Sequence, residues 1–131
     1  MEYLELEELR KRKRSQMAAL SEVEDLTRQL AAALDRRDEV SVQMLLNMRE
    51  EPIRRLQELD DGIRNYLENL PPEHAVQGAA LMQGGEAQDP VEIPLCEDVA
   101  RFRRLLSSVV EIDKRFNLRL GNDRSFYKTF R

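Results

Sequence analysis

The sequence has a single histidine and a single cysteine, the side chains that most readily act as a base or a nucleophile near neutral pH, and they lie far apart. The one histidine, His74, follows Pro71-Pro72, and the sequence contains no ExxH or HxxE pair of the kind that binds metals on helices. The one cysteine, Cys96, stands near the start of a predicted helix, where a small packing residue is expected. The sequence therefore predicts no catalytic residue and no metal site, and we expect that the protein is not an enzyme.

Cofactor binding has no support in the sequence either. Gly84-Gly85 is not followed by the GxxxxGK pattern of a phosphate-binding loop, and no strand is predicted before it. The many acidic residues alternate with basic ones, which is typical of solvated helix faces rather than of a two-metal centre. No cofactor is predicted.

Five consecutive basic residues, Arg10 to Arg14, form the strongest charge feature. Such a run can bind anionic lipid, RNA or an acidic partner. A solvated helix turn, neutralised by Glu5, Glu7 and Glu8, is the favoured interpretation, because consecutive helical residues point in different directions. The net charge of −4 also argues against nucleic acid as a partner.

The location of the protein is predicted from what the sequence lacks. The first 14 residues contain no apolar core of a signal peptide. No apolar run approaches the ~18 residues of a membrane span, and a lone cysteine fits a reducing compartment. We therefore expect a cytoplasmic protein without membrane insertion.

Apolar periodicity predicts the elements that carry these residues. The first helix is predicted at 3–34, where Lys13 and Gln16 interrupt an apolar stripe. The periodicity stops at the corner Leu34–Asp38, where Asp38 is the expected N-cap of the next helix. That helix is predicted at 39–70, and Pro52 is expected to kink it between Met48 and Glu51 or to break it in two.

The remainder is predicted as a connection at 71–94, a helix at 95–120 and an aromatic tail at 121–131. Within the connection, Glu73 to Met82 is a candidate short helix that Gly84-Gly85 ends, and Val91 and Ile93 are expected to be extended. Three long amphipathic helices predict an all-α fold, an antiparallel bundle in a single domain spanning 1–131.

The hairpin resembles a known family. The features that carry the likeness are the corner, the run Val42-x-x-Leu45-Leu46-x-x-x-Arg49-Glu50-x-x-Ile53-x-x-Leu56, the third helix ending Asn117-Leu118-Arg119-Leu120, and a tail containing Tyr127. With these residues the chain is similar to the flagellar export chaperones of the FlgN/FliT type. Pro52 and the Gly- and Pro-rich connection depart from the family pattern.

The resemblance implies a cytoplasmic chaperone that binds amphipathic C-terminal helices of hook-associated or filament-cap subunits and prevents their premature assembly. The third helix and the tail are the predicted partner surface, with apolar anchors at Val109, Ile112, Phe116, Leu120, Phe126 and Tyr127. Two alternatives remain open. One is a structural coiled-coil protein that self-associates through the same stripes, and the other is a basic-arm RNA or membrane-surface binder.

Overall fold

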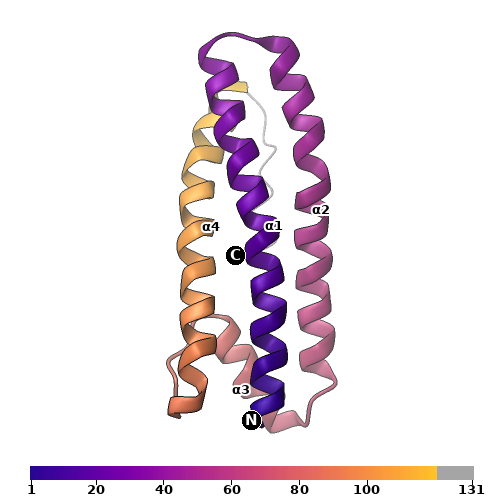
Figure 1. The fold of residues 1–131 in the computed structure, drawn as a ribbon, viewed down its shortest axis with the longest axis vertical. Helices are drawn as coiled ribbons and strands as arrows, with labels where there is room; N and C mark the ends of the chain where they lie inside the picture. The colour runs from indigo at the N-terminus through magenta and orange to yellow at the C-terminus, as the bar shows by residue number, and fades with distance from the viewer. Residues whose placement is uncertain (121–131) are drawn as a thin grey trace. The chain divides into compact units, whose positions relative to one another are not determined.

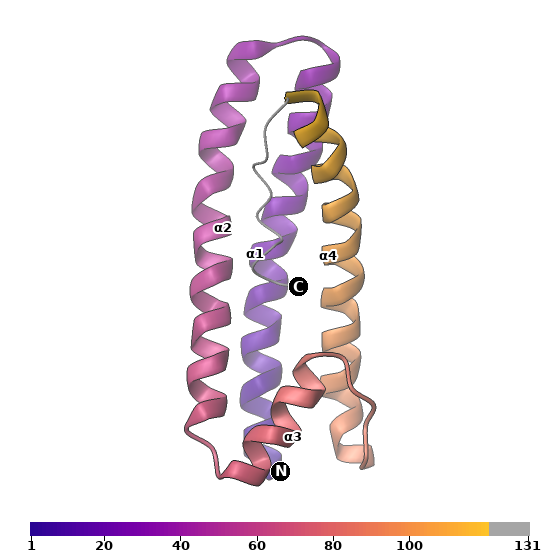
Figure 2. The same cartoon turned by 180° about the vertical axis from the view of Figure 1, so that it is seen from behind.

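A computed structural model describes residues 1–120 of the chain, except for the side chains of Phe116 and of residues 118–120. Within this part the fold is all-α, as predicted. Its elements are α1 (Tyr3–Asp35), α2 (Glu39–Glu68), α3 (Pro72–Met82), a 3-10 turn η1 (Pro90–Glu92) and α4 (Ile93–Leu120). Figure 1 and Figure 2 show them from opposite sides.

The chain divides into two compact units that share the long helices. Unit 1 consists of Met1–Met17 and Glu58–Arg104, so it holds the start of α1, the end of α2, α3 and the start of α4. Unit 2 consists of Ala18–Gln57 and the part of α4 from Leu105 onward. The prediction of a single domain over 1–131 stays a prediction.

In unit 2, α1 and α2 form a helical hairpin whose corner closes with a Schellman motif. The amide of Asp38 donates to the carbonyl of Ala33 at 2.9 Å, and that of Arg37 donates to Leu34 at 3.0 Å. Arg37 takes the left-handed conformation this motif requires, with φ of 55°, although glycine is the usual residue there.

Asp38 caps α2 as predicted. Its carboxylate accepts hydrogen bonds from the hydroxyl of Ser41 at 2.6 Å and from the backbone N–H of Ser41 at 3.1 Å. These two bonds stabilise the charged form and so lower the pKa of Asp38. The carbonyl of Asp38 accepts the first helical bond of α2, from Val42.

The core of unit 2 is built where the hairpin helices face each other. Leu30 and Ala33 of α1 pack with Val42, Leu45 and Leu46 of α2. From α4, Val109 and Asp113 are fully buried. The apolar periodicity of the sequence thus identifies the core-facing side of both hairpin helices.

In unit 1, the core joins all four helices around a second cluster. Its buried members are Leu6 and Leu9 of α1, Leu81 of α3, and Leu95 and Val99 of α4. Tyr66 and Leu67 at the end of α2 pack against them. Figure 2 shows α3 between the end of α2 and the start of α4, where it supplies Leu81.

One expectation for the chain between α2 and α4 is wrong. Val91 and Ile93 are not extended, because Pro90–Glu92 form a 3-10 turn and α4 already begins at Ile93. The side chain of Asp89 caps this turn by accepting from Val91 N–H at 3.0 Å. Prolines are tolerated in a first helical turn, where their missing N–H needs no partner, so Pro90 and Pro94 start helical structure here.

The other points in this region follow the sequence-based expectations. The short helix is present as α3, and Gly84, with φ of 95°, ends it. Within α2 itself, the helix continues through Pro52 without a break. The alternative prediction of two separate helices is therefore wrong.

Candidate interaction surface

α2 carries apolar residues on two faces, and only one of them is covered. Val42, Leu45 and Leu46 face the core and are at most 6% exposed. Val40, Met44 and Met48 follow a second line at a spacing of four and are 83%, 53% and 52% exposed. At 100° per residue these three side chains lie on nearly the opposite side of the helix from the core. We call Val40, Met44 and Met48 the α2 stripe.

The α2 stripe lies in a stretch of sequence without charged residues. From Val40 to Met48 the sequence has no acidic or basic residue, although 35% of the chain is charged. A stretch of nine residues at that average would hold about three charges. The polar neighbours Gln43 and Asn47 are exposed and neutral. An apolar line flanked by neutral polar groups has the composition of an interaction surface rather than of a solvated helix face.

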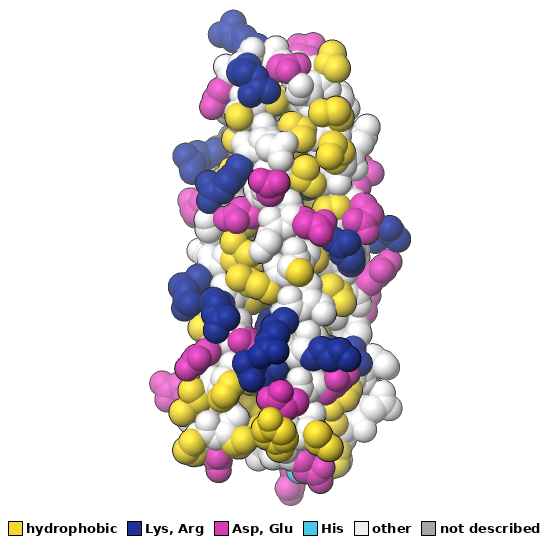
Figure 3. All heavy atoms as spheres, in the orientation of Figure 1, with side chains coloured by type: hydrophobic (Ala, Val, Ile, Leu, Met, Phe, Trp, Pro, Cys, Tyr) yellow, Lys and Arg dark blue, Asp and Glu magenta, His cyan; other side chains and the backbone are white. Residues whose placement is uncertain are grey.

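Methionine suits this surface chemically. Its unbranched, polarizable side chain adapts to partners of different shape, and exposed methionines recur on surfaces that bind amphipathic helices. Figure 3 shows hydrophobic side chains gathered on the surface around the start of α2. The sequence-based interpretation missed the α2 stripe because it followed only the stronger core-facing periodicity. The spacing of positions 40, 44 and 48 is nevertheless visible in the sequence.

A buried polar network holds α2 in the rotation that exposes the stripe. Arg49 is 3% exposed and donates to Asp113 of α4 at 2.7 Å and to the Thr27 hydroxyl of α1 at 3.1 Å. Asn117 adds a hydrogen bond to Asp113 at 3.2 Å. Because a buried charge must keep its partner, the network fixes which side of α2 faces α1 and α4.

The structure places the sequence-predicted anchors as follows. Val109 is 0% exposed and belongs to the core of unit 2, so it is not on the surface as expected. Ile112 is half-buried. Phe116 and Leu120 lie in α4, with side chains outside the described residues, and Phe126 and Tyr127 lie outside the described part of the chain.

His74 and Cys96, the histidine and cysteine of the sequence, both lie in unit 1. Nδ1 of His74 lies 2.8 Å from a carboxylate oxygen of Glu5. Cys96 packs against the unit 1 core, and burial raises the pKa of its thiol, which disfavours the reactive thiolate. Among residues that the structure describes, no three His, Cys, Asp or Glu side chains gather to hold a metal ion.

Unit 1 also buries a lysine. Lys13 is 6% exposed, donates to the Gln16 side chain at 2.7 Å, and holds its ammonium 4.2 Å from the centre of the Phe102 ring. Burial disfavours the charged form and lowers the pKa of Lys13 to about 8. The lysine that interrupts the predicted apolar stripe of α1 therefore still faces the core.

Within the described residues, no helix is both long and apolar enough to cross a bilayer. Comparison of the chain with protein-family models, with curated proteins and with solved structures gives no match in any of the three.

Proposed function

We propose that the protein is a binding protein that captures an amphipathic helix of a partner on the α2 stripe, in the manner of a flagellar export chaperone. The observation that carries the proposal is the exposed line Val40, Met44 and Met48 within a segment of α2 that has no charged residue. A partner helix that presents apolar residues at spacings of three and four matches this line.

The clients that the sequence resemblance implies are the C-terminal helices of hook-associated or filament-cap subunits. Before assembly, such a segment exposes an apolar face that promotes aggregation. Covering that face needs a complementary apolar line and no catalytic group. The half-buried Ile112, together with Phe116, Leu120, Phe126 and Tyr127, remains the proposed extension of this partner surface.

A second candidate function rests on the same observation. An exposed apolar line on a helix can pair with the same line of a second copy, which would make the protein a self-associating coiled-coil protein. Mass measurement in solution discriminates between the two. A monomer leaves the α2 stripe free for a client, whereas a stable dimer that protects Met44 and Met48 occupies it.

Calorimetric titration tests client capture. The probes are peptides of the C-terminal helical segments of hook-associated and filament-cap proteins from a flagellated bacterium. The double variant Met44→Lys/Met48→Lys is expected to weaken binding by about tenfold or more, because two lysines must be desolvated at the contact. The control is Val76→Lys in α3, a 72% exposed apolar residue of unit 1. Equal affinity of wild type and the double variant would contradict the proposal.

A further inference from the structure

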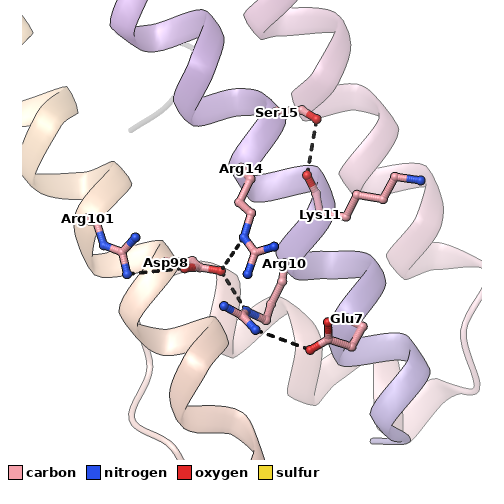
Figure 4. Close-up of polar contacts among 7 residues, drawn as sticks. All are labelled: Glu7, Arg10, Lys11, Arg14, Ser15, Asp98 and Arg101. Carbon is pink, nitrogen blue, oxygen red and sulfur yellow. Dashed lines mark hydrogen bonds and ion pairs between the residues drawn. The ribbon is translucent and has the colours of Figure 1, made fainter.

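Unit 1 gathers three arginines around one buried carboxylate. The Asp98 side chain in α4 is 4% exposed, and Nε of Arg10 in α1 donates to it at 2.9 Å. Nε of Arg14 lies 3.7 Å from the same carboxylate, and Nη2 of Arg101 lies 3.6 Å from its other oxygen. Figure 4 shows the three guanidinium groups pointing toward Asp98 from two helices. We call Arg10, Arg14, Arg101 and Asp98 the arginine cluster.

The three arginines do not share Asp98 equally. Arg10 has the short hydrogen bond, and that bond raises the pKa of its guanidinium. Arg14 and Arg101 stand at ion-pair distance only, and their side chains are 59% and 57% exposed. A guanidinium carries five N–H donors in a planar fork that matches a carboxylate. Arg14 and Arg101 therefore present donors to solvent beside a carboxylate that already orients them.

The charge balance of the arginine cluster favours a further anion. Three positive charges face two negative ones, Asp98 and the carboxylate of Glu7, which lies 3.4 Å from Arg10. Like charges held near one another repel, and an added anion relieves that repulsion.

The positions of the other basic residues between Arg10 and Arg14 indicate which class of anion the arginine cluster can bind. Arg12 bonds to Glu8 at 3.2 Å and lies over the ring of Tyr66, while Lys13 is buried in the core. The five consecutive basic residues are thus dispersed around α1, and only Arg10 and Arg14 reach the arginine cluster. A polyanion such as RNA or an anionic membrane needs an extended basic surface, which this dispersal removes.

We propose that Arg14 and Arg101 bind a carboxylate side chain of an acidic peptide segment in a protein partner. Asp98 positions the two guanidinium groups, and Arg10 holds Asp98 in place. The arginine cluster lies in unit 1 and contains none of the α2 stripe residues, so this proposal stands independently of client capture.

The test follows the arginine Nε–H signals by NMR while the full-length protein is titrated with the peptide acetyl-Glu-Ala-Ala-Glu-amide. The matched probe is acetyl-Gln-Ala-Ala-Gln-amide, which has no charge, and inorganic phosphate is titrated separately. Neither peptide has an apolar helix face, so the outcome does not depend on the α2 stripe. The acidic peptide is expected to shift the signals of Arg14 and Arg101 with millimolar affinity that weakens as salt increases.

The double variant Arg14→Gln/Arg101→Gln is expected to weaken binding of the acidic peptide by about fivefold or more. Both side chains are more than half exposed, so the fold should persist, and the amide spectrum verifies this. The control is Arg64→Gln, whose side chain in unit 1 is 61% exposed and pairs with Asp60. Equal shifts from the uncharged peptide, an equal loss in the control variant, or tighter binding of phosphate than of the acidic peptide would each overturn the proposal.

Discussion

Lys13 is a charged residue among buried side chains. It holds a core position of α1, where it is nearly buried beside Gln16 and Phe102. A lysine ammonium loses much of its hydration in such a place, and one hydrogen bond with one aromatic ring replaces only part of it. The folded state therefore binds the Lys13 proton less tightly than the unfolded chain does.

This difference predicts a pH dependence with a definite sign. Lys13 has a pKa of about 8 in the folded state and about 10.4 in an unfolded chain. Between these values the unfolded state binds more protons, so the free energy of unfolding rises with pH, by up to about 3 kcal/mol. Below pH 8 both states are protonated and the full cost of burying the charge is present.

Lys13→Met removes that cost and is expected to stabilise the protein by about 1–3 kcal/mol at pH 7. The gain should shrink as pH rises from 8 to 10. Urea unfolding at pH 7 and pH 10 measures both effects, with the exposed neighbour substitution Lys11→Met as the control. Identical pH profiles for Lys13→Met and Lys11→Met would contradict a lowered pKa of Lys13 in the folded state.

Arg37 has a backbone conformation that does not suit its residue type. Its φ of 55° suits glycine, because a side chain in the left-handed region crowds the following carbonyl. Arg37→Gly is expected to stabilise the protein by up to about 1 kcal/mol, which thermal unfolding can measure. The control is Arg36→Gly, at a position without positive φ, and it should lower stability. A loss of stability in Arg37→Gly would contradict the Schellman geometry of the corner.

At the scale of the elements, the buried ion pair of Arg49 and Asp113 joins α2 to α4 in unit 2. Both side chains are buried, at 3% and 0% exposure, so neither charge can be left alone without a large desolvation cost. Thr27 extends the pair to α1, because its hydroxyl oxygen accepts a hydrogen bond from Arg49. The three helices therefore meet through one polar network inside an apolar core.

Removing one partner of this pair should be worse than removing both. Arg49→Met alone is expected to destabilise the protein by about 3–5 kcal/mol, because the buried Asp113 loses the charge of Arg49. Arg49→Met/Asp113→Leu should recover most of that loss. Chemical denaturation of the single and double variants gives the coupling free energy. Additive losses in the double variant would mean that the two side chains do not act as a pair.

The sequence predicts the helices well and their polar contacts poorly. Spacings of three and four identify the core faces of α1, α2 and α4, and Asp38 identifies the start of α2, because these signals are local. Lys13 and Gln16 continue the apolar spacing of α1 but are polar, so periodicity alone reads them as interruptions. Pairing Arg49 with Asp113 needs the rotation of two helices far apart in the chain, which local patterns do not contain.

The candidate surface shows the same limit. Val109 continues the apolar spacing of α4 and was expected as a partner contact, but a spacing does not say whether another helix covers it. In the structure it is buried. The α2 stripe shows the opposite error. Its three apolar residues form a shorter pattern than the core-facing residues of α2, and only the structure shows that the core-facing side is covered and the stripe is exposed.

At the scale of the whole molecule, the described surface has two chemically different regions that we propose as binding sites. The α2 stripe in unit 2 is apolar and uncharged. The arginine cluster in unit 1 is positively charged and polar. The two regions therefore differ in their expected response to salt: apolar contact at the α2 stripe should persist at high ionic strength, and carboxylate binding at the arginine cluster should weaken.

The most direct test of the central claim observes the methionine methyl groups by NMR. The chain has five methionines, of which Met44 and Met48 belong to the α2 stripe and Met82 packs against the core of unit 1. On titration with an export-substrate helix, the methyl signals of Met44 and Met48 are predicted to shift while that of Met82 stays in place. Binding that leaves Met44 and Met48 unchanged would contradict capture on the α2 stripe.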